Sequence, residues 1–94
     1  MSLRNHNDPL EFPDLEEEFG EEAVRDAAST LNQDISPTIW ARIRGIDFID
    51  RIRVFAAVEN RMRGREQVLE ALRDRRQQLE EIGERDERMQ RGEA

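Results

Sequence analysis

The chain contains no cysteine, no lysine and no tyrosine, and it has a single histidine, His6. Without cysteine there are no disulfides and no thiolate metal sites, and one histidine cannot supply the paired Glu-x-x-His motifs of di-iron bundles. No apolar run approaches the roughly 20 residues that cross a membrane, and the first residues lack the apolar stretch of a signal peptide. We therefore expect a cytoplasmic protein without membrane contact, metal or cofactor.

Hydrophobic residues are also scarce. They make up 36% of the 94 residues, whereas charged residues make up 39%. A chain of this length forms one domain with a small core, and such domains are marginal unless a metal, a disulfide or a partner chain supplements them. Because metal and disulfides are excluded, the composition favours a partner chain, and the simplest partner is a second copy in a homodimer.

The charges that are present have an unusual composition. All fifteen basic residues are arginine, against 22 acids, which gives a net charge of −7. Arginine is more weakly hydrated than lysine and forms bidentate contacts with carboxylates. The combination resembles proteins of salt-loving archaea, in which molar salt screens self-repulsion within about 3 Å. It is also compatible with a bacterial genome of high GC content.

The charge is unevenly distributed along the chain. Residues 1–34 hold ten acids and two arginines, a charge of −8, whereas residues 35–94 hold twelve acids and thirteen arginines, a charge of +1. Within the second part, residues 39–65 carry a local charge of +4. Such asymmetry indicates either an acidic arm folded over a basic body or an acidic tail that repels or mimics nucleic acid.

Residues 46–82 organise the rest of the chain. Apolar residues recur there at helical spacing on both sides of the turn at residues 63–65, where Gly64 supplies a permissive backbone. Two amphipathic helices joined by so short a turn are expected to fold back antiparallel on each other. The sequence therefore predicts an all-α fold of three to four helices built on a long antiparallel helical hairpin.

Further helices are predicted on either side of this turn. One runs from Asp14, a candidate N-cap, to Leu31, and Gly20 is able to split it. A short helix begins at Ser36-Pro37 and is ended or kinked by Gly45. The last helix is expected to extend from Arg65 to about Arg88. This gives a disordered leader at residues 1–12, a single helical domain at residues 13–83 and a frayed polar tail at residues 84–94.

Glu59 is the one acid that falls on the apolar face of the first hairpin helix. A carboxylate in that position is costly unless it is paired. Arg65 lies just beyond the turn, so the sequence predicts a structural ion pair between Glu59 and Arg65 that fixes the register of the hairpin. A lone glutamate lacks the second acid, histidine or nucleophile that catalysis requires, so we do not expect an enzyme.

The apolar arc of the same helix is unusually wide. It spans about 220° of the helix circumference, against the ~100° stripe of a helix that is buried on one side only. An uncovered remainder would mark an interaction site, so the sequence predicts a protein–protein interaction or oligomerisation module. The predicted interface consists of Trp40, Phe48, Ile49, Val54, Phe55 and Val58.

Nucleic-acid binding is the alternative function. The region from Arg42 to Arg65 is rich in arginine, and a basic turn followed by a helix N-terminus can bind phosphates. The possible phosphate contacts are Arg51, Arg61, Arg63 and Arg65. Acids at helical spacing, such as Asp47 before Arg51, instead favour internal pairing, and the net negative charge opposes phosphate binding.

Residues 54–61 and 64–75 also carry two partial resemblances. VFAAVENR followed by GREQVLEALRDR resembles small, uncharacterised helical-hairpin proteins of halophilic archaea, a resemblance that implies the fold but no activity. The same hairpin is loosely similar to SAP-type and Rho-N-terminal-type nucleic-acid modules, which would imply phosphate contacts at the turn. It departs from the SAP-type pattern because its helices are longer and its turn lacks lysine.

Overall fold

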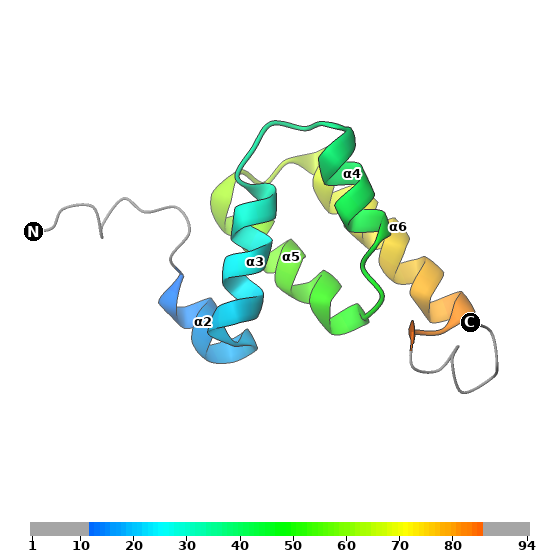
Figure 1. Ribbon diagram of the computed structural model, residues 1–94, viewed down its shortest axis with the longest axis horizontal. Helices are drawn as coiled ribbons and strands as arrows, with labels where there is room; N and C mark the ends of the chain where they lie inside the picture. Colours follow the sequence, from blue (N-terminus) through cyan, green and yellow to red (C-terminus); the bar gives the residue numbers. More distant parts are fainter. Residues whose placement is uncertain (1–11, 86–94) are drawn as a thin grey trace, which may run out of the picture.

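The computed structural model describes residues 12–85, and every regular element in that part of the chain is an α-helix. The all-helical class predicted from the sequence is confirmed there, but the described residues form five helices rather than three or four. The helices, labelled in Figure 1, are α2 (Pro13–Phe19), α3 (Glu21–Leu31), α4 (Pro37–Arg44), α5 (Ile49–Met62) and α6 (Glu66–Ile82).

Two glycines account for most of the difference between the predicted and observed helices. Gly20 has a φ of 100° and Gly83 a φ of 93°, in a region that residues with a side chain rarely adopt. Gly20 therefore separates α2 from α3, and Gly83 ends α6 at Ile82, well before the predicted end at Arg88. The predicted N-cap is also wrong, because Phe12 caps α2 and Asp14 lies inside its first turn.

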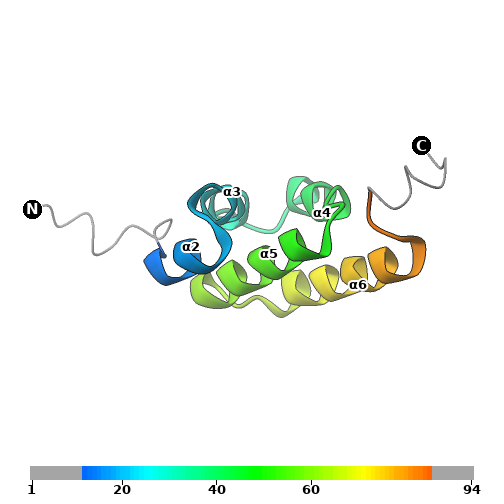
Figure 2. The same cartoon turned by 90° about the horizontal axis from the view of Figure 1, so that it is seen from below.

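The helix α5 lies at the centre of the molecule. It packs against α3 and α6, with a smaller contact to α2, while α4 packs against α3 and α6. Figure 2 shows α3 and α4 on one side and α6 on the other, with α5 between them. The structure is therefore organised around one helix with neighbours on several sides rather than around a two-helix hairpin.

The core is built mainly from aliphatic side chains, to which all five helices contribute. Val24, Leu31, Ile39, Val68 and Leu72 are at most 1% exposed, and they belong to the same buried cluster as the apolar residues of α5. Burying a side chain of this size stabilises a fold by about 1.5–3 kcal/mol. Within the described residues, no helix has the length and apolar character needed to cross a membrane.

The packed region extends slightly beyond the predicted domain at both ends. Phe12, assigned to the leader, packs against the core. Glu84, assigned to the polar tail, accepts a hydrogen bond from the backbone N–H of Ile49 (2.6 Å) and so satisfies a free donor in the first turn of α5. The remaining leader and tail predictions fall on residues 1–11 and 86–94, which lie outside the described residues.

Candidate functional site

Half of the predicted interface belongs to the core of a single chain. Val54, Phe55 and Val58 are 4%, 2% and 0% exposed, because α3 and α6 cover the α5 arc that carries them. Within one chain these three side chains are core residues, so this fold does not present them on its surface. The arc is wide because α5 needs apolar contacts on several sides, and the same chain provides those contacts.

The other three predicted interface residues reach the surface to different degrees. Trp40 on α4 and Ile49 at the start of α5 are half-buried and pack against the core. Phe48 is 38% exposed and lies beside Arg42 and Arg51 at the junction of α4 and α5. They do not form the continuous patch with Val54 and Val58 that the sequence predicts.

Glu59 and Arg65 form a buried ion pair that joins three helix ends. Glu59 is fully buried, and its carboxylate accepts hydrogen bonds from Nε and Nη2 of Arg65 at 2.9 and 3.0 Å. It also accepts the backbone N–H of Arg65 at 2.8 Å, directly before α6. Arg65 in turn donates to the carbonyls of Leu31 (2.9 Å) and Gln33 (2.7 Å) at the end of α3. The hydrogen bonds with Glu59 raise the pKa of Arg65 above its ordinary value.

The other candidate phosphate-binding arginines also have carboxylate partners. Arg61 pairs with Asp14 (2.7 Å), Arg63 with Asp34 (3.1 Å) and Arg51 with Asp26 (3.4 Å). These acids lie 25 to 47 residues earlier in the chain. Within the described residues, the acidic N-terminal part therefore supplies the ion-pair partners of these three arginines, and Glu59 of α5 supplies the partner of Arg65.

Aromatic rings from the N-terminal segment add to this arrangement. The guanidinium of Arg61 lies 5.7 Å from the ring centroid of Phe12, and that of Arg53 lies 5.9 Å from the ring of Phe19, both within cation–π distance. The hydrogen bonds from Arg61 also hold the pKa of Asp14 below its ordinary value. The segment thus attaches to α5 through a charged pair and two stacked arginines.

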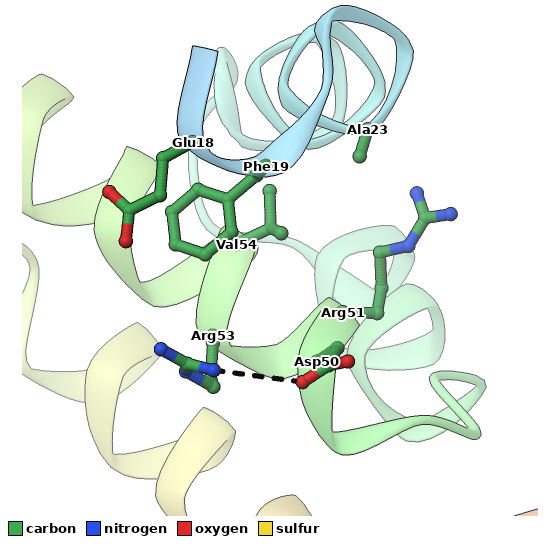
Figure 3. Close-up of a pocket in the computed structure, with 7 residues that line it drawn as sticks. All are labelled: Glu18, Phe19, Ala23, Asp50, Arg51, Arg53 and Val54. Atoms are coloured by element: carbon green, nitrogen blue, oxygen red, sulfur yellow. Dashed lines mark ion pairs between the residues drawn. The ribbon is translucent and has the colours of Figure 1, made fainter. Parts of the chain in front are cut away.

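A hollow of about 410 Å³ lies between the α2–α3 corner and α5. Figure 3 shows Glu18 and Phe19 on one side and the α5 side chains on the other, with Arg53 paired to Asp50 at 3.7 Å. The charged groups of Glu18 and Arg51 point in different directions instead of converging on one point. Among the described residues, no group of three histidine, cysteine or acidic side chains is placed to hold a metal ion.

A second hollow, of about 350 Å³, runs between α5 and α6; we call it the α5–α6 groove. Its floor is apolar and its edges carry arginines from both helices. Ala56 lines the groove with a single methyl group. No carboxylate is among the lining residues, which are Ile52, Arg53, Ala56, Asn60, Leu69, Leu72, Arg73 and Arg76.

This groove was not predicted from the sequence. Ile52 and Leu72 were identifiable as core positions from helical spacing, but a groove depends on how two helices are placed side by side. The available signal is the recurrence of lining residues three and four positions apart on both helices, namely 52, 53, 56 and 60 on α5 and 69, 72, 73 and 76 on α6. That pattern places residues on one face without showing that the face is open.

Over residues 12–85, these features define a helical module with an ion pair in its interior and an open groove edged by arginines. The chain belongs to the family described as Domain of unknown function (DUF8129), whose model matches residues 26–82, more than half of its 94 residues. The match includes α4, α5, α6, most of α3 and the whole α5–α6 groove, but it leaves out α2. No curated protein and no solved structure matches the chain.

Proposed function

We propose that this protein is a small interaction module that binds a helix of another protein in the α5–α6 groove. The observation that carries the proposal is the groove itself, which combines an apolar floor with exposed arginines inside the family-matched region. Amphipathic helices bind such grooves by placing residues spaced three and four apart against the floor. A depression next to Ala56 is suited to an apolar side chain from such a helix.

The arginine pairing supports protein contact over nucleic-acid binding. A phosphate-binding surface needs cations that are free to meet phosphates. Here Arg51, Arg61 and Arg63 already lie within 3.4 Å of an acid, and Arg65 holds a buried glutamate. Binding of nucleic acid would have to break these pairs on a chain with a net charge of −7.

Selection from a displayed library of helical peptides tests the proposal. Such a selection needs no knowledge of the natural partner. Ala56→Gln fills the groove with a polar side chain, and Ala41→Gln makes the same change on the exposed side of α4. We expect selected peptides to bind the wild type and Ala41→Gln equally and to lose about ten-fold in affinity with Ala56→Gln. Fluorescence anisotropy measures the binding, and thermal melts verify that both variants fold.

Two outcomes would contradict the proposal. One is a library that yields no binder, and the other is a set of binders that do not distinguish Ala56→Gln from the wild type. A titration with duplex DNA or RNA at low salt addresses the alternative function. Measurable affinity that falls linearly with salt on a log–log plot would favour nucleic acid.

A further inference from the structure

The α5–α6 groove is edged by cations on a molecule that is otherwise acidic. Arg53, Arg73 and Arg76 line it, and their side chains are 55%, 64% and 51% exposed. The chain carries a net charge of −7, yet no acid is among the lining residues. The groove therefore has a local charge opposite to that of the whole protein.

The acids that neighbour these arginines come from the same helix and hold them weakly. Arg53 is 3.7 Å from Asp50, Arg73 is 3.7 Å from Glu66 and Arg76 is 3.2 Å from Glu80. Such exposed pairs contribute little, because solvent screens them and long side chains lose freedom when they are held. A carboxylate from a partner can replace them with little loss, in contrast to the buried partner of Arg65.

A second copy of this chain does not fit the groove. A two-fold axis through it would place the same surface on both sides of the contact. Arg53, Arg73 and Arg76 of one copy would then face the same three arginines of the other, and like charges held together oppose association. The partner must instead bring carboxylates to the edges and apolar side chains to the floor.

We infer that the partner of the α5–α6 groove is an acidic amphipathic helix. Its apolar stripe lies over Ala56 and Leu69, and its glutamates or aspartates flank the stripe and meet Arg53 on one edge and Arg73 and Arg76 on the other. The inference rests on the proposed function, because it names the charge of a helix that the groove binds. The apolar floor supplies the attraction, and the arginines supply the selectivity.

Three synthetic helical peptides test the inference. They share one leucine stripe and differ only in the flanking residues, which are glutamate, glutamine or lysine. The protein variants are Ala56→Gln, the double variant Arg73→Gln/Arg76→Gln, and Arg44→Gln as a control that removes an exposed arginine of α4 outside the groove. Anisotropy at 0.15 M salt gives the dissociation constants.

We expect the wild type to bind the glutamate peptide about five-fold more tightly than the glutamine peptide. This is the combined contribution expected of two or three exposed ion pairs. The lysine peptide should bind most weakly. Arg73→Gln/Arg76→Gln leaves only Arg53 at the groove, so it should reduce the preference for the glutamate peptide without weakening the glutamine peptide. Arg44→Gln should leave that preference unchanged. Ala56→Gln should weaken the glutamate and glutamine peptides alike.

The possible failures are distinguishable. Equal binding of glutamate and glutamine peptides, both weakened by Ala56→Gln, overturns the acidic partner but supports a helix-binding groove. Glutamate-peptide binding that Ala56→Gln leaves intact shows attraction elsewhere on the surface and overturns the inference. Absence of binding by all three peptides counts against both proposals. A wild-type dimer that Ala56→Gln dissociates in sedimentation equilibrium identifies the occupant as a second copy and also overturns the inference.

Discussion

Glu59 is a fully buried carboxylate whose bonding capacity is met almost entirely by one residue. Both oxygens accept hydrogen bonds from Arg65, and the same arginine closes the end of α3 through the carbonyls of Leu31 and Gln33. A buried pair of this kind need not raise net stability, but it becomes costly when only one partner is removed. The pair therefore fixes how the ends of α3, α5 and α6 meet.

Removing the carboxylate should destabilise the protein strongly. We expect Glu59→Ala to lower the free energy of unfolding by about 3–5 kcal/mol, because it leaves the Arg65 guanidinium mostly buried without its acid. Urea denaturation followed by circular dichroism measures the change. Glu66→Ala, at an exposed acid on α6, is the control and should change the free energy by less than about 0.5 kcal/mol. Equal effects of the two substitutions would contradict the structural role.

The pair between Asp14 and Arg61 should give the protein a specific acid sensitivity. The hydrogen bonds from Arg61 hold the pKa of Asp14 below its ordinary value of 3.8, so the folded state binds this proton less readily than the unfolded state. The stabilisation is present above the ordinary pKa and is lost as the pH falls through the lowered value. Carboxyl NMR titration should show the lowered pKa, and Arg61→Gln should return it towards the ordinary value. A pKa of Asp14 that is unchanged by Arg61→Gln would contradict the pairing.

The sequence permits some of these residue contacts to be predicted but not others. Glu59 and Arg65 are six positions apart across a short turn, so a helical wheel and the cost of a buried charge are sufficient to pair them. Arg61 and Asp14 are 47 residues apart. Their contact depends on how α2 lies against α5, which neither the helical period nor local charge spacing determines.

At the scale of the elements, a wide apolar arc on a helix can be covered either by other helices of the same chain or by a second chain. The sequence shows that α5 needs apolar neighbours around much of its circumference, but it does not show which chain supplies them. Gly20 allows the chain to turn between α2 and α3, and both helices then pack on α5. This leaves no broad apolar surface at Val54 and Val58 for a second copy to cover.

This arrangement changes the expected effect of a charge in α5. Val58→Glu should unfold the monomer rather than dissociate a dimer, because Val58 is fully buried between helices of one chain and an unpaired buried carboxylate costs several kcal/mol. Circular dichroism should show loss of helix, whereas Phe48→Glu, at a side chain that is 38% exposed, should retain it. A folded monomeric Val58→Glu variant would contradict the assignment of Val58 to the core and favour the predicted dimer interface.

At the scale of the whole molecule, the acidic and arginine-rich parts of the chain are brought together. Asp14, Asp26 and Asp34 each reach an arginine of α4, α5 or the turn after α5. Of the two interpretations of the charge asymmetry, this contact favours an acidic arm folded over a basic body. The arm neutralises the arginines locally, but the molecule still carries 22 acids against fifteen arginines.

The response to salt follows from two opposed electrostatic effects. Salt screens the exposed ion pairs, most of which contribute at most about 1 kcal/mol each, and it also screens the repulsion produced by a net charge of −7. Because the Glu59–Arg65 pair is buried, screening affects it much less than the exposed pairs. The repulsion acts over the entire surface, and the Debye length of the solution falls from ~10 Å at 0.1 M to ~3 Å at 1 M salt.

We therefore expect the melting temperature to rise between 0.1 and 1 M sodium chloride, as in a protein adapted to a salt-rich cytoplasm. Calorimetry across that range measures it, with Glu17→Gln/Glu22→Gln, which removes two exposed acids, as the comparison. This variant should have a higher melting temperature at low salt and should gain less from added salt. A wild-type melting temperature that stays flat or falls with salt would show that the ion pairs dominate, and it would remove the case for a halophilic origin.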